Sequence, residues 1–509
     1  MKKNINELYK IAQNIECPKL SALLTDIIEN SDYEKTWADL YHLTMAQTSL
    51  LAGDHDKVAT FEMFIRQNPF GGGYTVAAGL GPVLEWLSEY GFSDKTVAHL
   101  ATLTNANGTP MFGAEFLEFL RNQPLQVTID AVPEGELVFP NQPIVRVTGP
   151  EWQVNIIETA FLNGINASSL IATKASRIKR AAGEKPVLEF GLRRAQDMYG
   201  MRPTRSAAAG GVFGTSNVDA ARRYDITARG THAHAFVMKY DTEMEAFETM
   251  LKHNPDNGSL LVDTYCTVQG VKNAIAAAKK TGVTLNSIRL DSGDMVQLSM
   301  DARQLLNTAG MRDTKIVASN DLDEHKITVM RRAGAQIDIW AVGTNLVTAA
   351  DQPALGGVYK LKQIDGKDRI KISGDLIKTS IPGATETIRL LNNLGHFMGD
   401  VITTMNFTTE ESGTLTAPII SVDHKTNQFV TYPVGTKFYK PLKRVVTNGA
   451  VDMTVARRDV NEIGQATTRN LYKLDDAHQK FEGAREYPVG LEKSLFMKRM
   501  EMTFQDRQH

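Results

Sequence analysis

Between residues 186 and 348, short apolar runs alternate with stretches of helical periodicity. Such alternation is typical of a parallel α/β sheet, in which a helix follows each strand and packs on the sheet. Predicted helices cover residues 267–280, 300–309 and 324–333. About seven strands in this span fit an irregular α/β barrel better than a small open sheet. The predicted strands cover residues 187–190, 211–213, 235–238, 260–262, 287–290, 315–318 and 337–340.

The segments on either side of this span have different patterns. Alternating apolar residues predict strands within residues 58–65 and 125–147 and again beyond residue 356, whereas residues 151–182 have the periodicity of a long helix. We therefore divide the chain into an N-terminal α/β domain (1–150), a barrel (151–355) and a C-terminal part (356–509) that is β-rich and then mixed. Further predicted elements are helices at 1–30, 84–90 and 114–121, β runs at 358–361 and 370–372, and a hairpin formed by 418–422 and 429–432.

Composition and charge indicate a soluble protein without a broad surface for polyanions. The chain has 509 residues, a formal net charge of -2 and two cysteines, Cys17 and Cys266. A nearly neutral chain attracts neither nucleic acid nor membrane through its overall field, so an anionic substrate would need local basic residues. Two distant cysteines, no apolar segment of a signal peptide and no membrane-spanning run predict a cytoplasmic protein.

Polar and glycine-containing segments follow most of the predicted strands. Because the carboxyl ends of parallel strands meet at one edge of the sheet, we expect these segments to converge there. They cover residues 191–194, 214–217, 263–265, 291–294, 319–321 and 343–345.

The stretch from Gly230 to Val237 contains His232 and His234, two residues apart. In an extended strand or strand entrance, alternate side chains share a face, so both imidazoles would point the same way. A neutral imidazole can act as a nucleophile, a base or a metal ligand, or it can be a hydrogen-bonded polar residue with no chemical role. No third ligand accompanies the pair, which argues against a metal site.

Two further sites carry candidate chemistry for phosphate groups. Arg289 and Asp291 alternate on one strand, so they either close the strand end as an ion pair or bind phosphate and ribose hydroxyl groups. Gly343 and Thr344 follow an apolar strand and offer backbone N–H groups and a hydroxyl, as in a phosphate-binding loop. Two common nucleotide-binding motifs, the P-loop and a strand-linked G-x-G-x-x-G, are absent from the sequence.

Arg193 belongs to a pair of arginines, Arg193 and Arg194, that follows the first predicted strand. The two arginines are either a solvated basic pair, or one of them holds a carboxylate in bidentate geometry. The chemistry of this position is therefore open from the residues alone.

Taken together and in this order, the motifs closely resemble those of the nicotinate phosphoribosyltransferase family. The resemblance covers about residues 35 to 350, and its strength lies in the ordered set because each motif alone is modest. The motifs that carry it lie at residues 39–45, 64–72, 189–196, 214–218, 230–234, 261–265, 289–294 and 342–344.

The resemblance implies an irregular α/β barrel flanked by an α/β domain that is built from both halves of the chain. It implies a homodimer with active sites at the subunit interface. The implied reaction joins nicotinate to phosphoribosyl pyrophosphate and gives nicotinate mononucleotide and pyrophosphate, with coupled hydrolysis of ATP. This is the first step of NAD salvage from nicotinate, and magnesium is the expected cofactor because it neutralises the leaving pyrophosphate.

The resemblance also implies roles for individual residues. His234 matches a histidine that ATP phosphorylates transiently, and Asp291 joins it as a catalytic residue. Four positions match the nicotinate site and three match the phosphoribosyl site, whereas the magnesium ligands are not assigned. The nicotinate-site positions are Tyr41, which would stack on the pyridine ring, Arg193, Ser216 and Thr231; the phosphoribosyl positions are Arg289, Gly343 and Thr344, the last two at the 5′-phosphate.

Two alternative functions stay open. A nicotinamide-using relative would recognise the carboxamide through Asp where this chain has Ser216, and a carboxylate there would repel nicotinate, so serine favours the acid. A catalytically silent binding protein of the same fold is the other alternative, against which His234, Arg289 and Asp291 argue. Cys266 and Ala235 depart from the familiar residues, Asp and Ser, without touching an assigned role.

Overall fold

The computed structural model describes residues 18–19, 36–373, 379–423 and 425–505. The helix predicted at residues 1–30 lies almost entirely outside these residues, as does Cys17.

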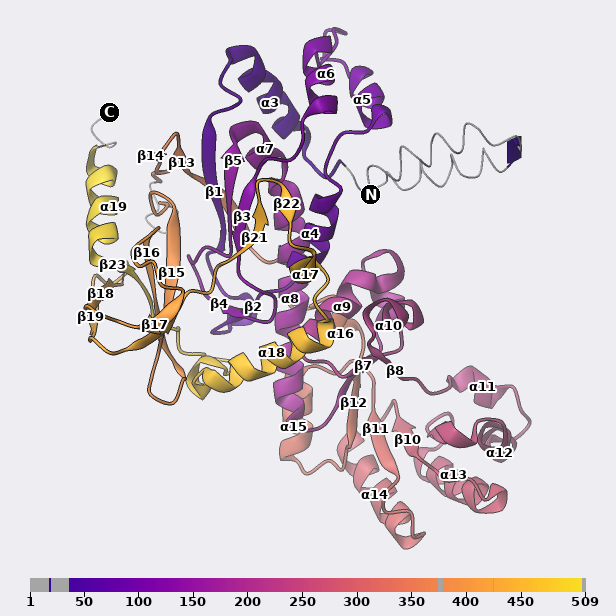
Figure 1. Ribbon diagram of the computed structural model, residues 1–509. Coiled ribbons are helices and arrows are strands. Elements are labelled where there is room, and N and C mark those ends of the chain that lie inside the picture. The colour runs from indigo at the N-terminus through magenta and orange to yellow at the C-terminus, as the bar shows by residue number, and fades with distance from the viewer. Residues whose placement is uncertain (1–17, 20–35, 374–378, 424, 506–509) are drawn as a thin grey trace.

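A parallel seven-stranded sheet forms the part of the chain that was predicted to be a barrel (Figure 1). All its neighbouring strands pair in parallel, and on the strand next to one edge Ile288 pairs with Leu260 on one side and Ile316 on the other. The fold class is therefore confirmed. The strands are β6 (Val187–Glu189), β7 (Gly214–Thr215), β8 (Thr227–Ala228), β9 (Ser259–Leu261), β10 (Ser287–Leu290), β11 (Lys315–Ala318) and β12 (Ile339–Val342).

The curled sheet is open on one side. Its strand order is β8-β7-β6-β12-β11-β10-β9, so the first and last strands of the unit pair with each other while β8 and β9 are the two edges among the described residues. The chain between these edges forms α11 (His234–Met238) and α12 (Glu243–His253) instead of pairing them. The unit is thus a half-barrel whose opening is flanked by the segment that carries His234.

Helices cover the outer face of the half-barrel, and a much smaller apolar cluster lies on its inner face. Ile288 and Ile316 pack outward with residues of the helices, whereas Val317 belongs to the small inner cluster. Because Arg289 alternates with Ile288 and pairs with Val317, it lies on the inner face. The covering helices are α13 (Thr267–Thr281), α14 (Met295–Thr308) and α15 (Glu324–Arg332); α9 (Met201–Ala209), α10 (Val218–Tyr224) and α16 (Thr344–Val347) complete the unit.

Two predicted strands of this unit are wrong. Residues 235–238 form helix α11, in which Val237 is fully buried against the outer core. A short apolar run fits a buried strand and a buried helix equally well, so its periodicity could not decide between them. Residues 211–213 precede a strand rather than form it, because β7 begins at Gly214.

A second sheet joins the two ends of the chain. It is antiparallel in the order β14-β13-β1-β5-β3-β21-β22 and contains strands from before and after the half-barrel, which confirms a flanking domain built from both halves. The predicted strand at 370–372 is wrong, since β14 lies at Lys367–Asp368. The strands are β1 (Val58–Ile65), β3 (Thr128–Ala131), β5 (Val145–Pro150), β13 (Gly357–Ile364), β14, β21 (Lys443–Thr447) and β22 (Ala450–Val451).

Helices from the N-terminal region pack with this sheet in one large core. They include the predicted helices at 84–90 and 114–121, found at α4 (Leu80–Ser88) and α6 (Ala114–Asn122). The other helices of this region are α3 (Leu40–Ala52), α5 (Asp94–Ala101) and α7 (Glu151–Ile156).

Within the described residues, the C-terminal part contributes a third, mixed sheet and three α-helices. The predicted hairpin is confirmed, because Ile419–Val422 and Phe429–Tyr432 pair in an antiparallel manner. The two hairpin strands are β18 and β19. The other strands and helices of this part are β15 (Thr385–Leu391), β16 (Phe397–Thr404), β17 (Ser412–Thr414), β20 (Lys437–Tyr439), β23 (Val489–Glu492), α17 (Met453–Ala456), α18 (Val460–Lys473) and α19 (Lys493–Gln505). In the N-terminal region, β2 (Thr75–Val76) and β4 (Leu137–Val138) form a small separate pair.

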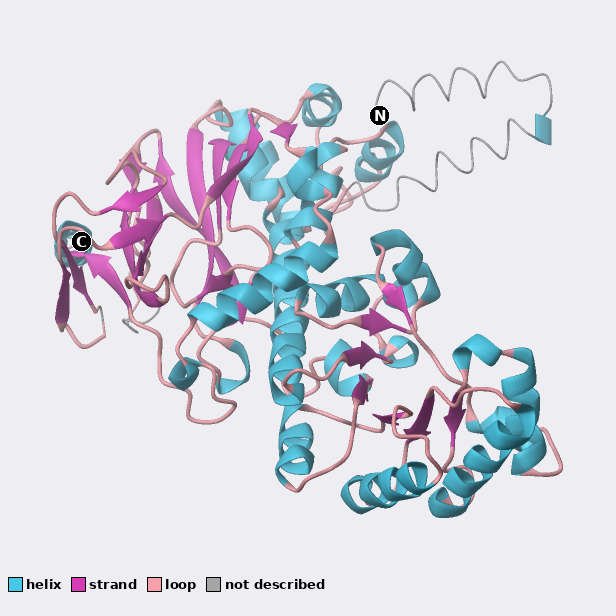
Figure 2. Cartoon of the chain, turned by 60° about the horizontal axis from the view of Figure 1, so that its bottom comes forward, coloured by secondary structure: helices cyan, strands magenta, loops and turns pink. Residues whose placement is uncertain are grey.

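The long helix α8 (Glu158–Ala182) connects the sheets with the half-barrel (Figure 2). It contacts α4 on one side and α9 and α15 on the other. Its buried Lys174 and Arg177 form ion pairs of 2.8 Å and 2.7 Å with the two oxygens of Glu324 at the start of α15. Charge-assisted bonds thus hold the half-barrel to the helix at a buried position.

A second buried bond joins the half-barrel to the N-terminal part. Arg205 of α9 donates to both carboxylate oxygens of Glu134, at 2.8 Å and 2.7 Å, and Gly79 and Gly81 donate their backbone N–H groups to the same carboxylate. Removing one partner of such a pair leaves a buried charge uncompensated, so α9 has a fixed position relative to the N-terminal part.

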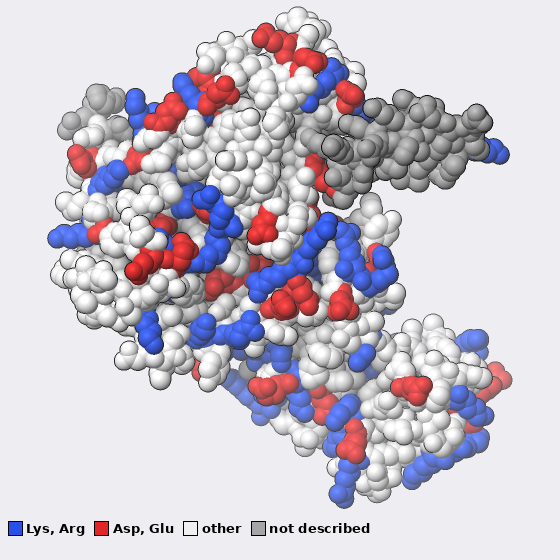
Figure 3. Space-filling model, in the orientation of Figure 1, with Lys and Arg blue, Asp and Glu red and all other residues white. Residues whose placement is uncertain are grey.

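The surface carries both signs of charge. Lysine and arginine side chains are interspersed with acidic side chains over the face shown in Figure 3, as the small net charge predicts. Among the described residues, no helix combines the length and the apolar character that crossing a membrane requires.

Candidate active site

His234 is the first residue of α11, at the edge of the half-barrel where the strands end. Its Nδ1 lies 3.2 Å from the hydroxyl oxygen of Thr264. Its Nε2 lies 3.8 Å from Asp291 Oδ2 and 3.9 Å from Asp263 Oδ1. The imidazole is 40% exposed, so one ring nitrogen is anchored while the other faces two carboxylates and remains accessible.

His232 has a different environment, and the prediction that both histidines share a strand face is wrong. The chain leaves β8 before Gly230 and begins α11 at His234, so the two side chains lie in a loop and a helix. His232 Nε2 accepts a hydrogen bond of 3.0 Å from the backbone N–H of Leu261, and its ring contacts Phe236. Burial lowers the pKa of His232 below its usual value.

Arg289 and Asp291 form the predicted ion pair, with 2.9 Å between Nη2 and Oδ1. Arg289 also donates to Ser319 Oγ at 2.8 Å and to Thr231 Oγ1 at 3.2 Å. Its guanidinium lies over the ring of Phe190. The ends of β10, β11 and the loop after β8 are thereby joined through one cation on the inner face.

Asp263 completes this cluster, although no role was predicted for it from the sequence. Its Oδ2 accepts hydrogen bonds from the backbone N–H of Asp291, at 2.9 Å, and from Ser292 Oγ, at 2.6 Å. Its Oδ1 is buried without a hydrogen-bond partner in the described part of the chain. The available signal was its position directly after a predicted apolar strand.

The oxygen donors of this cluster fit a magnesium ion that substrate oxygens would also coordinate. Asp263 Oδ1 and Asp291 Oδ2 both face His234, and magnesium usually takes one or two carboxylates and completes its shell with water and phosphate oxygens. Within the described ranges, no group of three or more His, Cys, Asp or Glu residues is arranged to hold a metal alone.

Arg193 and Ser216 lie on neighbouring loops that follow β6 and β7. Arg193 belongs to a short 3-10 helix, η2 (Leu192–Arg194); it is exposed and makes no ion pair with any residue that the structure describes. Ser216 is half-buried, and its backbone N–H donates to the carbonyl of Glu189 at 3.0 Å. An exposed guanidinium and a small hydroxyl side chain on neighbouring loops suit an anionic ligand.

Gly343 and Thr344 form the turn between β12 and α16, next to the loop of Arg193. The two loops approach closely, since a Cβ atom on Gly191 would lie 2.8 Å from the carbonyl oxygen of Gly343. Thr344 begins α16, and the first N–H groups of a helix have no acceptor within it. The phosphate-binding role of this turn stays a prediction.

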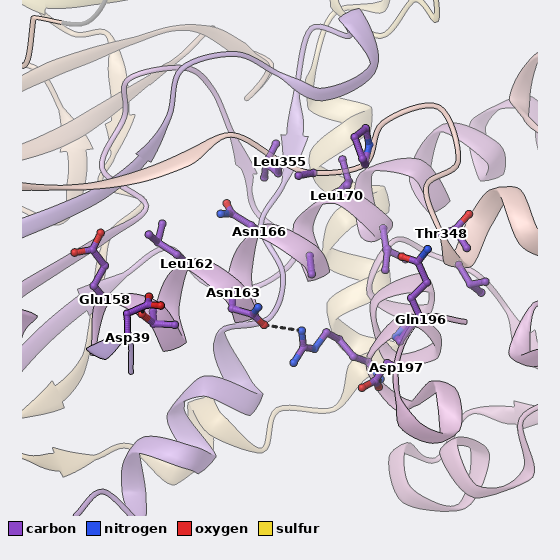
Figure 4. A pocket seen from close by; sticks show the side chains of 18 of the residues that line it. Asp39, Glu158, Leu162, Asn163, Asn166, Leu170, Gln196, Asp197, Thr348 and Leu355 are labelled. Atoms are coloured by element: carbon purple, nitrogen blue, oxygen red, sulfur yellow. Dashed lines mark hydrogen bonds between the residues drawn. The ribbon is translucent and has the colours of Figure 1, made fainter. Parts of the chain in front are cut away.

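Tyr41 lies elsewhere, on α3, and lines a cavity of about 430 Å³. The cavity lies between α8 and the segments that follow Arg193 and Thr344 (Figure 4). Burial raises the pKa of the Tyr41 hydroxyl, and the charges of Glu158 and Asp39 raise it further, so the phenol stays neutral. No contact in the described chain joins Tyr41 to His234.

A basic cleft lies at one end of the antiparallel sheet. Arg66, Lys360 and Lys371 are among its lining residues. Burial lowers the pKa of the Lys360 ammonium, Glu158 opposes this change, and the charges of Lys371 and Arg66 lower the pKa further. Clustered cations that repel one another favour an anionic ligand.

Three family models match successive parts of the chain. They describe the nicotinate phosphoribosyltransferase N-terminal domain at residues 36–166, the nicotinate phosphoribosyltransferase family at 186–406 and the C-terminal domain at 385–499. The chain belongs to the nicotinate phosphoribosyltransferase family. It is an enzyme by this membership, and the resemblance of its motifs is confirmed.

Proteins named nicotinate phosphoribosyltransferase in other organisms are similar to most of this chain. The nicotinate phosphoribosyltransferase of Bacillus subtilis is 39% identical over 472 residues, which cover 91% of this chain and 94% of that protein. The protein of the same name from Dictyostelium discoideum is 37% identical over 416 residues, covering 72% and 70%.

Solved structures support the fold of the family. The crystal structure of human nicotinic acid phosphoribosyltransferase matches with a TM-score of 0.78 and 25% identity, covering 92% of this chain and 100% of that one. A nicotinate-nucleotide pyrophosphorylase from Pyrococcus furiosus matches with a TM-score of 0.65 at 22% identity, which indicates a shared fold alone.

The structure thus places the residues predicted for the nicotinate phosphoribosyltransferase site in two groups, with one residue apart from both. His234, Asp291, Arg289 and Thr231 form one connected cluster. Arg193, Ser216, Gly343 and Thr344 lie on loops at the same edge of the sheet. Tyr41 belongs to neither group, and the roles given to all these residues stay predictions.

Proposed function

We propose that this chain transfers the phosphoribosyl group of phosphoribosyl pyrophosphate to the ring nitrogen of nicotinate in the synthesis of NAD. The observation that carries the proposal is membership of the nicotinate phosphoribosyltransferase family over most of the chain, together with the connected cluster of His234, Arg289 and Asp291. A catalytically silent protein would have no need to keep this cluster intact.

The cluster suits displacement of pyrophosphate from C1 of the ribose. The bond from C1 to the pyrophosphate oxygen breaks with its electron pair, and the nitrogen lone pair of nicotinate forms the new bond. Positive charge builds on the sugar ring, and Asp291 supplies the carboxylate that stabilises it. Arg289 would hold phosphate oxygens, and Gly343 with Thr344 would hold the 5′-phosphate.

Nicotinate would bind between the loops that carry Arg193 and Ser216. The exposed guanidinium of Arg193 can pair with the carboxylate of nicotinate, whereas Ser216 adds no opposing charge. Thr231, whose hydroxyl accepts from Arg289, would connect nicotinate binding with the phosphoribosyl contacts. Tyr41 would stack on the pyridine ring from the neighbouring subunit of a homodimer.

We further propose that ATP phosphorylates His234 on Nε2. The nitrogen lone pair would form the bond to the γ-phosphorus as ADP leaves, and water would later cleave this bond to release phosphate. Thr264 orients the ring through Nδ1, and Asp263 Oδ1 faces the reacting nitrogen. A phosphoryl group adds charge that can reorganise the surrounding loops and so couple the two ligand events.

Both co-substrates are polyanions, so charge must be neutralised locally. Asp263 and Asp291 would hold magnesium, whose charge would neutralise the departing pyrophosphate. The cations Arg66, Lys360 and Lys371 of the basic cleft would attract such polyanions toward the flanking domain.

Product formation from phosphoribosyl pyrophosphate tests the proposal, with nicotinate and nicotinamide supplied separately and with or without ATP. We expect nicotinate mononucleotide, a strong preference for nicotinate, and stimulation by ATP. Equal or better turnover of nicotinamide would instead favour the nicotinamide-using alternative, and no turnover of either would favour a silent binding protein.

Ser216→Asp is the sharpest change for specificity. A carboxylate beside the nicotinate site would repel the acid but not the amide, so we expect the KM for nicotinate to rise at least about tenfold and the KM for phosphoribosyl pyrophosphate to change little. Ser216→Asn is the control, because asparagine is similar in size to aspartate but neutral. Equal effects of both substitutions would show that size rather than charge matters there.

A further inference from the structure

Glu189 ends strand β6 and is 1% exposed. Its carboxylate accepts hydrogen bonds from the backbone N–H of Gly191, from Thr204 Oγ1 at 3.0 Å and from Thr215 Oγ1 at 2.6 Å. No lysine, arginine or histidine of the described residues forms an ion pair with it. A carboxyl group is therefore buried at the carboxyl end of β6, where its hydrogen bonds come from uncharged donors alone.

The donors come from three separate elements. Gly191 precedes the 3-10 helix that carries Arg193, Thr204 lies on α9, and Thr215 ends β7 directly before Ser216. A carboxylate can only accept hydrogen bonds, so it forces both hydroxyls to point toward it. One side chain thus connects the two loops that carry the proposed nicotinate residues.

The connections continue beyond the carboxylate. Thr215 Oγ1 accepts from the backbone N–H of Asn217 at 2.9 Å, and the Asn217 side chain donates to the carbonyl of Tyr199 at 2.8 Å. Asn217 also caps α10, since its Oδ1 accepts from Ala220. The two loops are therefore bonded to each other both through Glu189 and around it.

This network shares no hydrogen bond with the cluster of His234, Arg289 and Asp291 among the described residues. The partners of Arg289 are Asp291, Ser319 and Thr231, and those of Glu189 all belong to β6, β7, α9 and the loops that follow them. Gly191, which donates to Glu189, packs against Gly343 of the proposed phosphate loop, so a change at Glu189 also reaches that loop. The hydroxyl of Thr215 is bonded to Glu189 and Asn217, so its loss should act on the nicotinate side and leave the phosphoribosyl side intact.

We propose that Glu189 is a positioning residue that sets the separation of Arg193 and Ser216 and thereby the preference for a carboxylate over a carboxamide on the pyridine ring. The inference rests on the proposed function, because it assigns nicotinate to these two loops. Glu189 acts through Arg193 and Ser216 and does not touch the ring itself.

Thr215 provides a matched pair of variants for the test. Thr215→Val keeps the shape of the side chain and removes the hydroxyl, whereas Thr215→Ser keeps the hydroxyl and removes a methyl group. Loss of a bond to a buried carboxylate should raise the KM for nicotinate about tenfold in Thr215→Val, with kcat and the KM for phosphoribosyl pyrophosphate within about twofold of wild type. Thr215→Ser should resemble wild type.

Glu189→Gln and the double variant Glu189→Gln/Thr215→Val complete a double-mutant cycle. If both residues act through one bond, the effect of the double variant on nicotinate KM should be smaller than the product of the single effects. The ratio of kcat/KM for nicotinate to that for nicotinamide should fall in both single variants. A residue that only stabilised the fold would lower the unfolding midpoint and the amount of active enzyme without moving this ratio.

These experiments separate failure of the proposed function from failure of the role proposed for Glu189. Failure of the wild-type enzyme to use nicotinate overturns the proposed function itself. The role of Glu189 is overturned if the wild-type enzyme uses nicotinate but folded Thr215→Val protein has an unchanged KM for nicotinate. It is also overturned if the KM for phosphoribosyl pyrophosphate rises in Thr215→Val as much as the KM for nicotinate. If Glu189→Gln does not fold, the Thr215 pair decides alone.

Discussion

The two histidines near the opening of the half-barrel have contrasting surroundings. His232 accepts a backbone hydrogen bond from Leu261 and contacts two phenylalanines, so its ring supports the structure of the loop. His234 is half-exposed, with Asp263 and Asp291 on one side and Thr264 on the other. Only His234 presents a ring nitrogen to a ligand at this edge.

Phosphorylation should therefore be specific to His234. Incubation with γ-labelled ATP should give an acid-labile label that maps to the peptide containing His234, and His234→Asn should carry none while keeping slow transfer without ATP, because Arg289 and Asp291 remain. His232→Gln is the matched control and should keep the label, since its amide oxygen can accept from Leu261. Label on His232 alone, or on no histidine, would contradict the assignment.

His232 should also make stability depend on pH. Burial holds its folded pKa below the ordinary 6.5, so the unfolded chain takes up a proton first as the pH falls. The contribution of His232 to the free energy of unfolding is thus complete above pH 6.5 and is lost progressively below it. We expect the stability advantage of wild type over His232→Gln, measured by urea unfolding, to shrink between about pH 8 and about pH 5.5. An advantage that grows on acidification would refute the sign of this shift.

At the scale of elements, the contact between α13 and the end of β9 positions Asp263. Gly270 of α13 lies directly against the backbone of Val262, and a Cβ atom there would overlap the Val262 carbonyl oxygen. Because Asp263 is the next residue, any shift of α13 would move a carboxylate that faces His234. The small residue thus connects helix packing with the geometry of the site.

Gly270→Ala should lower both stability and activity. Overpacking usually costs about 1–3 kcal/mol, which a urea midpoint would report, and displacement of Asp263 should lower ATP-stimulated turnover. Gly356→Ala is the control, because a Cβ atom there meets nothing within 4 Å and its φ is not positive. If the two variants behave alike, the close approach at Gly270 does not determine the site.

Elements with long, regular patterns were predictable from the sequence. The strand Val58–Ile65 and the helix Thr267–Thr281 were found almost at their predicted bounds, because several apolar positions repeat with one period. The helix His234–Met238 was missed because five residues hold too little periodicity. The opening between β8 and β9 was also beyond prediction, since strand pairing depends on contacts distant in sequence.

The residues of the candidate site differ in the same way, because some could be predicted from local sequence pattern and others could not. The pair of Arg289 and Asp291 could be predicted because alternation along one strand puts both on one face. Asp263 and Glu189 could not be assigned roles, because their partners come from other strands and helices. What the sequence did provide for Asp263 was a polar residue directly after an apolar run.

At the scale of the molecule, Tyr41 is separated from the cluster that it is expected to serve. It is 50% exposed on α3, next to the exposed Leu40 and Met45. The cavity beside it faces the loop after Arg193 within the same chain, so two arrangements can be distinguished: Tyr41 serves its own half-barrel, or it serves that of a second subunit.

Mixing two defective variants separates these arrangements. In a shared site, Tyr41→Ala and His234→Asn subunits would form mixed dimers with one intact site, so random exchange should restore roughly a quarter of ATP-coupled turnover. Mixing His234→Asn with Asp291→Ala is the control and should restore nothing, because both changes lie in one half-barrel. No recovery in the first mixture, despite demonstrated subunit exchange, would place Tyr41 in the site of its own chain.

The sheet shared by both halves of the chain has a consequence for how the protein is made. β1 pairs with β13, about 300 residues later, and β3 pairs with β21, more than 300 residues later. During translation, β1 and β3 leave the ribosome long before these partners exist. Their apolar faces therefore remain without these partners while the half-barrel, which lies between them and their partners in the sequence, is synthesised. Closing such distant pairs is slow and exposes nascent chains to aggregation. We therefore expect the half-barrel to fold first, with the flanking domain completed only after the C-terminal strands have emerged.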